Sequence, residues 1–244
     1  MTHSSDGQIS VTYKNVMGDD LTVVNAARVS FGKETSSNLY CRGPDARPLI
    51  PVLNQPDINL INYLAKHKHM SPFGHAFASF HVKAPIFVAR QLVKHKFLRW
   101  NEISRRYVDD EPEFYVPDVW RGRSEDKKQG SDGVVTYFDT TRAKGKSLPL
   151  SDVYKHQMEA MNDYYKDMIE GGVAPEQARM VLPQSTMTEW WWSGSLDAFA
   201  DMCKLRLKDD TQYETRLVAQ MIDKEMSHMF PVSWAALVKG ENDE

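Results

Sequence analysis

The sequence predicts a mixed α+β or α/β fold with considerable helix content. Several segments carry apolar residues at helical spacing, and only a few short runs alternate apolar and polar residues as strands do. The chain has 244 residues, which fits one large domain better than two small ones. No repeat or linker divides it. We therefore expect one domain over residues 1–244, with loop insertions near 32–56 and 109–150.

The first quarter of the chain contains one expected strand and one expected helix. Residues 9–13 alternate in the manner of a short strand. Asp19 or Asp20 is a suitable N-cap for a helix that ends near Ser30. Glycines and prolines are frequent in residues 32–56, and they predict a loop.

The next segments predict a helix, a turn, a strand and a second helix. Residues 57–69 have helical spacing, with Asp57 as the expected N-cap. Residues 71–75 are expected to form a turn, and residues 76–83 alternate like a strand. Pro85 should end that strand and open an apolar helix.

Residues 109–150 are rich in glycine and charge, which predicts a surface excursion with a short hairpin around 134–138. Ser151 then begins an amphipathic helix, which Gly171 and Gly172 stop. Its stripe of methionines and tyrosines predicts a core-facing surface. A short helix opened by Pro175 follows.

The last quarter of the chain predicts a strand or turn and two helices. The three consecutive tryptophans at 190–192 belong to the strand or turn. Ser195 is the expected cap of the next helix. The final helix should begin at Thr211, with Glu214 completing a capping box, and end at Pro231.

Composition excludes several classes of protein. A net charge of −3 and an isoelectric point of about 6.2 argue against general nucleic-acid or membrane-surface binding. Cys41 and Cys203 are too few for a disulfide framework, and the amino terminus lacks the apolar core of a signal peptide. No apolar run approaches the roughly 18 residues of a membrane span. We expect a cytoplasmic protein whose partner is small.

Residues 94–107 contain five cationic side chains among polar side chains that can donate or accept hydrogen bonds. Asn101, Glu102 and Ser104 interrupt the run of positive charge. A plain basic patch would indicate a solvated surface or a nucleic-acid site. The mixture instead indicates a small anionic ligand that combines a phosphate with a polar ring.

The same stretch resembles the R-H-R-x-x-S-x-N-E-x-S-x-R-Y signature of the flavin-dependent thymidylate synthases. Lys94 and Lys96 keep the charge of the two arginines without their planar fork, and Arg99 replaces the first serine. The family's T/S-P-F-x-H, A-R-x-x-L-P and L-R elements resemble residues 71–75, 178–183 and 205–206. The identical signature positions are His95, Asn101, Glu102, Ser104, Arg106 and Tyr107.

This resemblance implies a fold and an activity. The fold would be a small, mostly antiparallel sheet flanked by several helices. The activity would be reductive methylation of dUMP to dTMP, with carbon from 5,10-methylenetetrahydrofolate, hydride from FADH2, and NADPH or NADH as the reductant of FAD. A homotetramer with shared active sites is implied as well. The alternatives are a flavin- or pterin-dependent reductase on the same fold and a nucleic-acid-binding module that uses the cations of residues 94–106.

The resemblance also assigns residues to ligands. His69 would lie near the folate, and Arg206 would activate the uracil, because a five-donor fork can stabilise negative charge on the ring. The residues implied to contact dUMP are Gln91, Lys94, Glu102, Ser104, Arg105, Arg106, Arg179 and Arg206. Those implied to contact FAD are Ser71, Lys94, His95, Lys96, Glu102, Ser195, Asp197 and Asp201.

Two substitutions in this pattern carry expectations of their own. Ser195, Asp197 and Asp201 occupy the family's N-x-R-x-x-x-N element but match none of its polar residues. A carboxylate at Asp197 should compete for the amides of the helix terminus and repel the FAD phosphates, unless Lys204 or Arg99 compensates. Arg99 should either strengthen binding of the dUMP phosphate or pair with a nearby acid.

We expect neither a metal site nor an enzyme nucleophile. His67, His69, His75 and His81 lie close in sequence, but no carboxylate or cysteine completes a familiar ligand spacing. Neither Cys41 nor Cys203 has the setting of a reactive thiolate, and Ser104 has no evident base. This agrees with the family's mechanism, in which reduced flavin supplies the hydride and no side chain needs to attack the pyrimidine.

Overall fold

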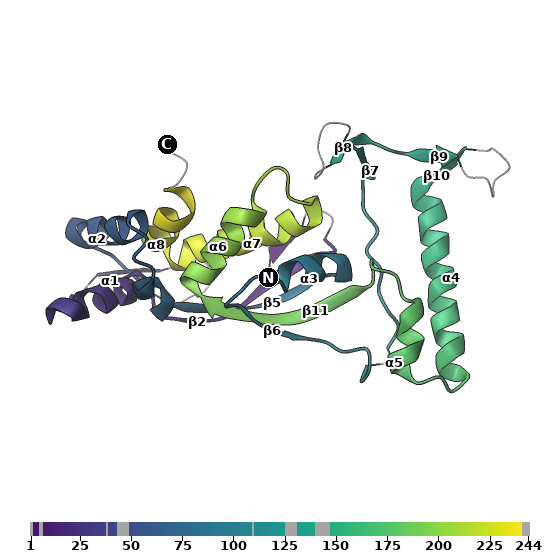
Figure 1. Cartoon of the computed structure of the whole chain (residues 1–244), viewed down its shortest axis with the longest axis horizontal. Helices are drawn as coiled ribbons and strands as arrows, with labels where there is room; N and C mark the ends of the chain where they lie inside the picture. The colour runs from purple at the N-terminus through teal and green to yellow at the C-terminus, as the bar shows by residue number, and fades with distance from the viewer. Residues whose placement is uncertain are drawn as a thin grey trace.

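The computed structural model describes the chain except residues 1, 5–6, 38, 43–48, 109, 125–130, 140–146 and 241–244. Its centre is a five-stranded sheet with the order β1-β2-β5-β11-β6, in which every pair is antiparallel (Figure 1). The five strands are β1 (Thr2–His3), β2 (Ser10–Met17), β5 (Phe77–Pro85), β6 (Arg99–Glu102) and β11 (Met187–Ser195). The expected mixture of helices with a small antiparallel sheet is confirmed.

Alternation along β5 and β11 gives the sheet one buried face and one exposed face. Phe80 and Val82 are fully buried, whereas His81 between them is only half-buried. In β11, Trp190 and Trp192 are buried and Trp191 is 46% exposed. The three tryptophans therefore form a strand, because the period of two lets the first and third enter the core while the second faces outward.

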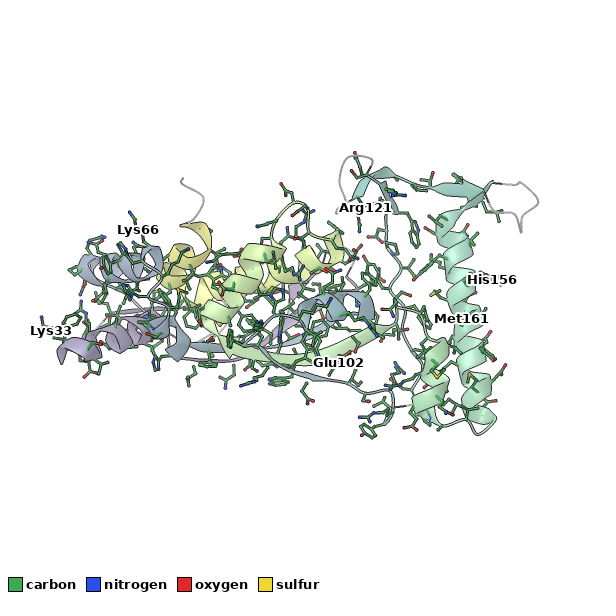
Figure 2. All side chains as sticks on the ribbon, in the orientation of Figure 1. Lys33, Lys66, Glu102, Arg121, His156 and Met161 are labelled. Carbon is green, nitrogen blue, oxygen red and sulfur yellow. The ribbon has the colours of Figure 1, made fainter. Side chains whose placement is uncertain are left out.

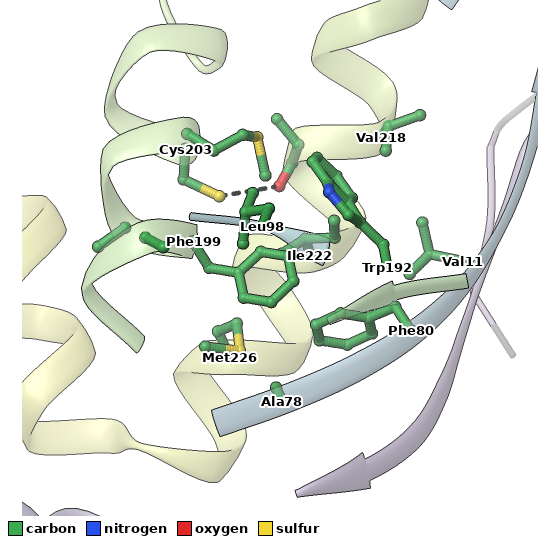
Figure 3. Close-up of a cluster of buried hydrophobic side chains, with 14 of the residues drawn as sticks. Val11, Ala78, Phe80, Leu98, Trp192, Phe199, Cys203, Val218, Ile222 and Met226 are labelled. Carbon is green, nitrogen blue, oxygen red and sulfur yellow. Dashed lines mark hydrogen bonds between the residues drawn. The ribbon is translucent and has the colours of Figure 1, made fainter. Parts of the chain in front are cut away.

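Three helices cover the buried face of the sheet: α3 (Ile86–Leu92), α6 (Leu196–Arg206) and α7 (Tyr213–Met229) (Figure 1). Phe199 of α6 meets the rings of Phe80 and Trp192 edge to face, at centroid distances of 5.3 and 5.5 Å (Figure 3). Cys203 lies among the same side chains, and its thiol faces the carbonyl oxygen of Ala219 at 3.7 Å. This core fixes the end of α6, where Arg206 is located.

A second group of helices packs beside the sheet: α1 (Asp20–Arg28), α2 (Gln55–Lys66), α8 (Pro231–Trp234) and the π-helix Ala235–Lys239 (Figure 1). Asp19 caps α1 through a capping box with Thr22, which confirms the expected cap. Arg28 pairs with the buried Asp57 of α2. The carboxylate of Asp20 accepts hydrogen bonds from the backbone N–H groups of Val232 and Ser233, both at 2.9 Å.

Residues 109–150 lead away from the sheet to a long helix (Figure 1). They contain the hairpin of β7 (Arg121–Arg123) with β8 (Ser131–Val134) and that of β9 (Tyr137–Asp139) with β10 (Ser147–Pro149). The helices α4 (Leu150–Glu170) and α5 (Pro175–Ala178) follow, and the 3-10 helix Arg179–Val181 continues α5. Tyr165 is the one buried member of the expected methionine and tyrosine stripe of α4, whose other members are half-buried.

The structure corrects the expected loops. Residues 32–56, which follow the 3-10 helix Val29–Phe31, contain a hairpin of β3 (Tyr40–Arg42) with β4 (Leu49–Pro51). The expected single hairpin around 134–138 is divided between two hairpins, because β8 ends at Val134 and β9 begins at Tyr137. The expected turn 71–75 is a 3-10 helix, Ser71–His75.

Two helix starts also differ from expectation. The N-cap of α2 is Asn54, whose side chain accepts from the Asp57 amide, so Asp57 lies inside the first turn. The capping box at Glu214 is wrong, since this side chain bonds to Arg121 and Gln212 instead. Pro231 marks the end of α7 as expected, since α7 ends at Met229, but α7 is not the last helix, because Pro231 opens α8. None of the described helices is both long and apolar enough to cross a membrane.

Candidate active site

The structure brings Gln91, His95 and Arg206 together. Gln91 lies near the end of α3, His95 lies in the turn that follows, and Arg206 is the last residue of α6. The Nε of Arg206 donates to Nε2 of His95 at 2.9 Å, and its Nη2 donates to the backbone oxygen of Gln91 at 3.4 Å. These two bonds hold the guanidinium in one orientation, and its remaining N–H groups can serve a ligand.

The same contact keeps His95 neutral. Burial, followed by the positive charge of Arg206, lowers the pKa of His95 to about 4. Burial also lowers the pKa of Arg206. A neutral imidazole can accept at Nε2, whereas a protonated one cannot, so the Arg206–His95 bond requires the low pKa.

This pKa predicts a pH dependence of stability. The ordinary histidine pKa of 6.5 applies to the unfolded chain, and the folded value is about 4. Between these values the unfolded state binds the proton more strongly, so the free energy of unfolding should fall as pH falls from 6.5 toward 4. Urea unfolding across that range should show a shallower decline in His95→Gln than in the wild-type protein. His156→Gln, which removes an exposed histidine of α4, should keep the wild-type profile; equal profiles for all three proteins would contradict the assignment (Figure 2).

A cavity of about 520 Å³ adjoins Arg206 and Gln91. Its walls come from α3, from the end of α6 with the segment 210–213, and from the β7–β8 hairpin through Arg121 and Ser131. A more apolar cavity of about 460 Å³ is also lined by Arg121 and Ser131, together with aromatic side chains such as Tyr115 and Trp120. The first cavity is large enough for a small polar ligand, and it contains the guanidinium expected to bind one.

The other residues of the basic stretch lie on and after the edge strand β6. Glu102 accepts from the Thr188 hydroxyl at 2.7 Å and from the Trp100 indole at 3.0 Å. Arg105 donates to the backbone and side chain of Asp110 at 2.6 and 3.0 Å. The backbone and Nε of Arg106 lie 3.3 Å from the Ser104 hydroxyl, and both donate to it. Arg99 makes no ion pair with another described residue, so its expected partner acid is not found.

The turn between α3 and β6 packs closely against β11 at Gly194. A Cβ at Gly194 would come within 2.3 Å of Cδ2 of Leu98 and 3.2 Å of the Phe97 carbonyl. Phe97 itself has a positive φ of 66°, which is rare for a residue with a side chain. Glycine at 194 thus permits the tight turn that places His95 beside Arg206.

Three of the residues expected to bind FAD, Ser195, Asp197 and Asp201, lie at the start of α6. Ser195 is the N-cap of α6, but its side chain makes no capping hydrogen bond. Oδ1 of Asp197 is enclosed and has no hydrogen-bond partner in the described part of the chain, so this atom does not compete for the amides of α6. Asp201, one turn later, is exposed and lies 3.7 Å from the Lys204 ammonium.

The neighbouring cavity of about 920 Å³ lies between α2, α6 and the π-helix. Its charged lining residues are Lys66, Lys68, Lys204 and Asp201, so positive charge is in excess (Figure 2 labels Lys66). Such a cavity suits a diphosphate, and the Lys204 ammonium that lines it pairs with Asp201. The residues present therefore fit a dinucleotide cofactor, with the enclosed carboxylate of Asp197 as the unfavourable element.

Several expected site residues lie neither at the Arg206 cavity nor at the cavity between α2 and α6 within this chain. Arg179 is exposed on the 3-10 helix after α5, donates to the Glu176 carbonyl at 3.2 Å, and does not line the Arg206 cavity. Figure 1 draws α5 beside α4, well away from the end of α6. Lys94 and Lys96 are exposed beside His95, and His69 and Ser71 are exposed after α2.

No group of three or more histidine, cysteine or carboxylate side chains converges on one point in the described ranges. Cys203 is buried, and burial followed by the charge of Asp223 raises the pKa of its thiol well above the ordinary value. Cys41 is exposed on β3. A buried thiol with a raised pKa is a poor nucleophile, which agrees with the absence of an assigned nucleophile in the sequence.

Sequence reasoning missed the polar residues around Gln91. Thr215 donates to the side-chain oxygen of Gln91 at 3.1 Å, and the side chain of Gln91 donates to that of Gln212. Glu214 and Arg121 extend this network. Arg121 is far from these residues in sequence and belongs to no motif, so only the folded chain reveals it. For Glu214, the near-match to a capping box hid the contact.

The chain is similar to known proteins of one family. Residues 13–232 match the family model described as thymidylate synthase complementing protein. The chain is 38% identical over 220 residues to a flavin-dependent thymidylate synthase of Thermus thermophilus, covering 90% of this chain and 72% of the relative. It is 36% identical to the corresponding protein of Thermosipho africanus, covering 92% and 89%. Among solved structures, the UMP/dUMP methylase PolB of Streptomyces cacaoi, bound with 5-Br dUMP, has a TM-score of 0.73 and 28% identity over 95% of each chain.

Proposed function

The chain belongs to the flavin-dependent thymidylate synthase family, and on that premise we propose that its Arg206 site binds dUMP for methylation to dTMP. The observation that carries this proposal is the half-buried guanidinium of Arg206, held by His95 and by the Gln91 backbone at the wall of a cavity. The protein is a flavin-dependent methyltransferase, and when bound the reduced flavin supplies the hydride.

The chain's own residues have two tasks in this reaction. Arg206 donates hydrogen bonds toward the uracil and stabilises negative charge that develops on the ring. Gln91 provides a further donor at the same cavity. The folate-derived carbon donor, 5,10-methylenetetrahydrofolate, and NADPH or NADH as reductant are part of the proposal, with His69 near the folate. No thiolate is required.

We place FAD at the cavity between α2 and α6. Lys66, Lys68 and Lys204 supply positive charge for its phosphates, and Ser71 and Ser195 lie at the neighbouring segments. We also propose that Lys94 and Lys96, the cations of the 94–96 turn, contact FAD.

We also propose a homotetramer in which active sites are shared between subunits. Phe97 and Tyr107, within the signature stretch, expose 82% and 79% of their surfaces, and Met180 beside Arg179 exposes 79%. Large apolar side chains at this level of exposure suggest contact with another chain. In such an assembly Ser104, Arg106 and Arg179 of one chain would complete the Arg206 site of another.

Asp197→Arg is expected to tighten FAD binding by about 1–2 kcal/mol, the value of a hydrogen bond to a charged group. The substitution removes an enclosed carboxylate from the start of α6 and adds a cation there. FAD should be titrated into flavin-stripped wild-type and variant protein at low and moderate salt. Asp152→Arg makes the same charge change in the first turn of α4 and should leave the affinity unchanged. Equal affinities of wild type and Asp197→Arg would show that Asp197 lies away from the cofactor.

The proposed function is tested by product analysis. Purified protein with FAD, NADPH, 5,10-methylenetetrahydrofolate and dUMP should form dTMP, and omission of any one component should stop turnover. UMP should be run in parallel, because the solved relative PolB is described as a UMP/dUMP methylase. Oxidation of NADPH without dTMP would favour a reductase instead.

A further inference from the structure

The β7–β8 hairpin reaches the proposed substrate site through Arg121, which is labelled in Figure 2. Its Nη2 lies 2.5 Å from Oε1 of Glu214, and its Nε donates to the Ser131 hydroxyl at 2.9 Å. Its guanidinium carbon also lies 4.7 Å from the centre of the Tyr213 ring. Only 5% of the Glu214 side chain is exposed, so Arg121 neutralises a buried carboxylate.

A relay of side-chain hydrogen bonds continues from Glu214 to Gln91. The side-chain nitrogen of Gln212 donates to Oε2 of Glu214 at 3.1 Å. The side-chain nitrogen of Gln91 donates to the side-chain oxygen of Gln212. The hydroxyl of Thr215 then donates to the side-chain oxygen of Gln91 at 3.1 Å. Each amide therefore presents its nitrogen toward the carboxylate end of the relay.

The direction of this relay is set by charge. An ionised carboxylate accepts hydrogen bonds but cannot donate them, so the NH2 group of Gln212 must face Glu214. The side-chain oxygen of Gln212 then faces Gln91, which must donate a hydrogen bond to it from its own NH2 group. That NH2 group keeps a second N–H that no other described residue takes, and Gln91 lines the Arg206 cavity.

We propose that Arg121 and Glu214 are positioning residues that fix the Gln91 amide with its N–H available to the substrate. This inference rests on the proposed function, since it takes the ligand at Gln91 and Arg206 to be dUMP. The free N–H suits an anionic phosphate or a uracil carbonyl, whereas a reversed amide would present an oxygen and repel either one. The hairpin of the 109–150 insertion thereby acquires a function in substrate binding.

Glu214→Gln should reverse the relay while every group stays paired. Arg121 would donate to the side-chain oxygen of the new glutamine, so the NH2 group of that glutamine would face Gln212. The Gln212 amide would then turn its oxygen toward residue 214 and its NH2 group toward Gln91. The Gln91 amide would turn in the same way. We expect the Kd of flavin-loaded protein for dUMP, measured by calorimetry, to rise about tenfold. The KM for dUMP should rise similarly, while kcat and the flavin spectrum stay near wild type. Arg206 contacts Gln91 only through the backbone oxygen, so a turned side-chain amide leaves the guanidinium in place.

A double-mutant cycle shows whether the effect passes through Gln91. In a Gln91→Ala background, adding Glu214→Gln should change the dUMP affinity no further, since no amide remains to turn. A further loss in that background would overturn the relay. Arg123→Ala, an exposed arginine of the same strand, is the matched control and should bind dUMP as the wild type does.

A second variant keeps the test independent of the stability of Glu214→Gln. Arg121→Met with Glu214→Met replaces the buried ion pair by apolar groups, a change that often preserves stability. The Gln91 amide could then take either orientation, and the dUMP affinity should fall roughly twofold. If both variants bound dUMP with wild-type affinity, the relay would be wrong, but the proposed function would stand. Failure of the wild-type protein itself to bind dUMP would overturn the proposed function, and the relay with it.

Discussion

Arg206→Ala should lower kcat for dTMP formation by about a hundred- to a thousandfold, the usual cost of removing a donor that stabilises developing negative charge. The fold should persist because Arg206 is only half-buried at the end of α6, and flavin binding should persist because Arg206 does not line the proposed FAD cavity. Steady-state kinetics, flavin absorbance and circular dichroism of the same preparation measure all three properties.

Two controls separate charge from position in this experiment. Arg206→Lys keeps the charge without the planar fork, and its activity should be low but above that of the alanine variant. Arg216→Ala removes a nearby arginine that pairs with Asp209, and it should remain active. The pKa of His95 should rise from about 4 in Arg206→Ala, since one of the two causes that lower it is gone. Normal turnover of Arg206→Ala would remove the residue from the mechanism.

Asp20→Ala should lower the free energy of unfolding by about 2–4 kcal/mol. The carboxylate of Asp20 is 1% exposed and accepts the two backbone N–H groups that start α8. Alanine would leave both donors buried without a partner, next to the helices that border the proposed FAD cavity. Urea unfolding measures the loss.

Asp20→Asn retains one acceptor oxygen and should lose less stability than the alanine variant. Asp209→Ala, which removes an exposed carboxylate, should unfold like the wild type. If Asp20→Ala were as stable as the wild type, the two backbone bonds would not hold α8 against α1.

Local sequence patterns predict the helices and strands whose own residues carry a clear apolar period. Alternation located β5, and helical spacing with terminal glycines located α4. The edge strand β6 was not predicted, because Arg99–Glu102 is polar and becomes a strand only by pairing with β11. The hairpins in the two insertions were missed or misplaced for a related reason, since strands of three or four residues carry too few positions for a period to be recognised.

In the site, too, sequence motifs predict some residues, whereas others are found only from their contacts in the folded chain. The family resemblance identified Gln91, His95 and Arg206, and the structure brings these three together. It could not identify Arg121 or Glu214, whose contact joins residues 93 positions apart without a motif. Ser104, Arg105 and Arg106 do not line the Arg206 cavity of their own chain, which is the physical basis for proposing sites shared between subunits.

Release of tritium from 5-tritiated dUMP tests the central claim most directly. If the Arg206 cavity binds dUMP for methylation, tritium should appear in water only when FAD, NADPH and 5,10-methylenetetrahydrofolate are all present, in step with dTMP. Arg206→Ala should reduce the release by the same factor as dTMP formation. Absence of tritium release while NADPH is still oxidised would contradict the account and identify a flavin-dependent reductase on this fold.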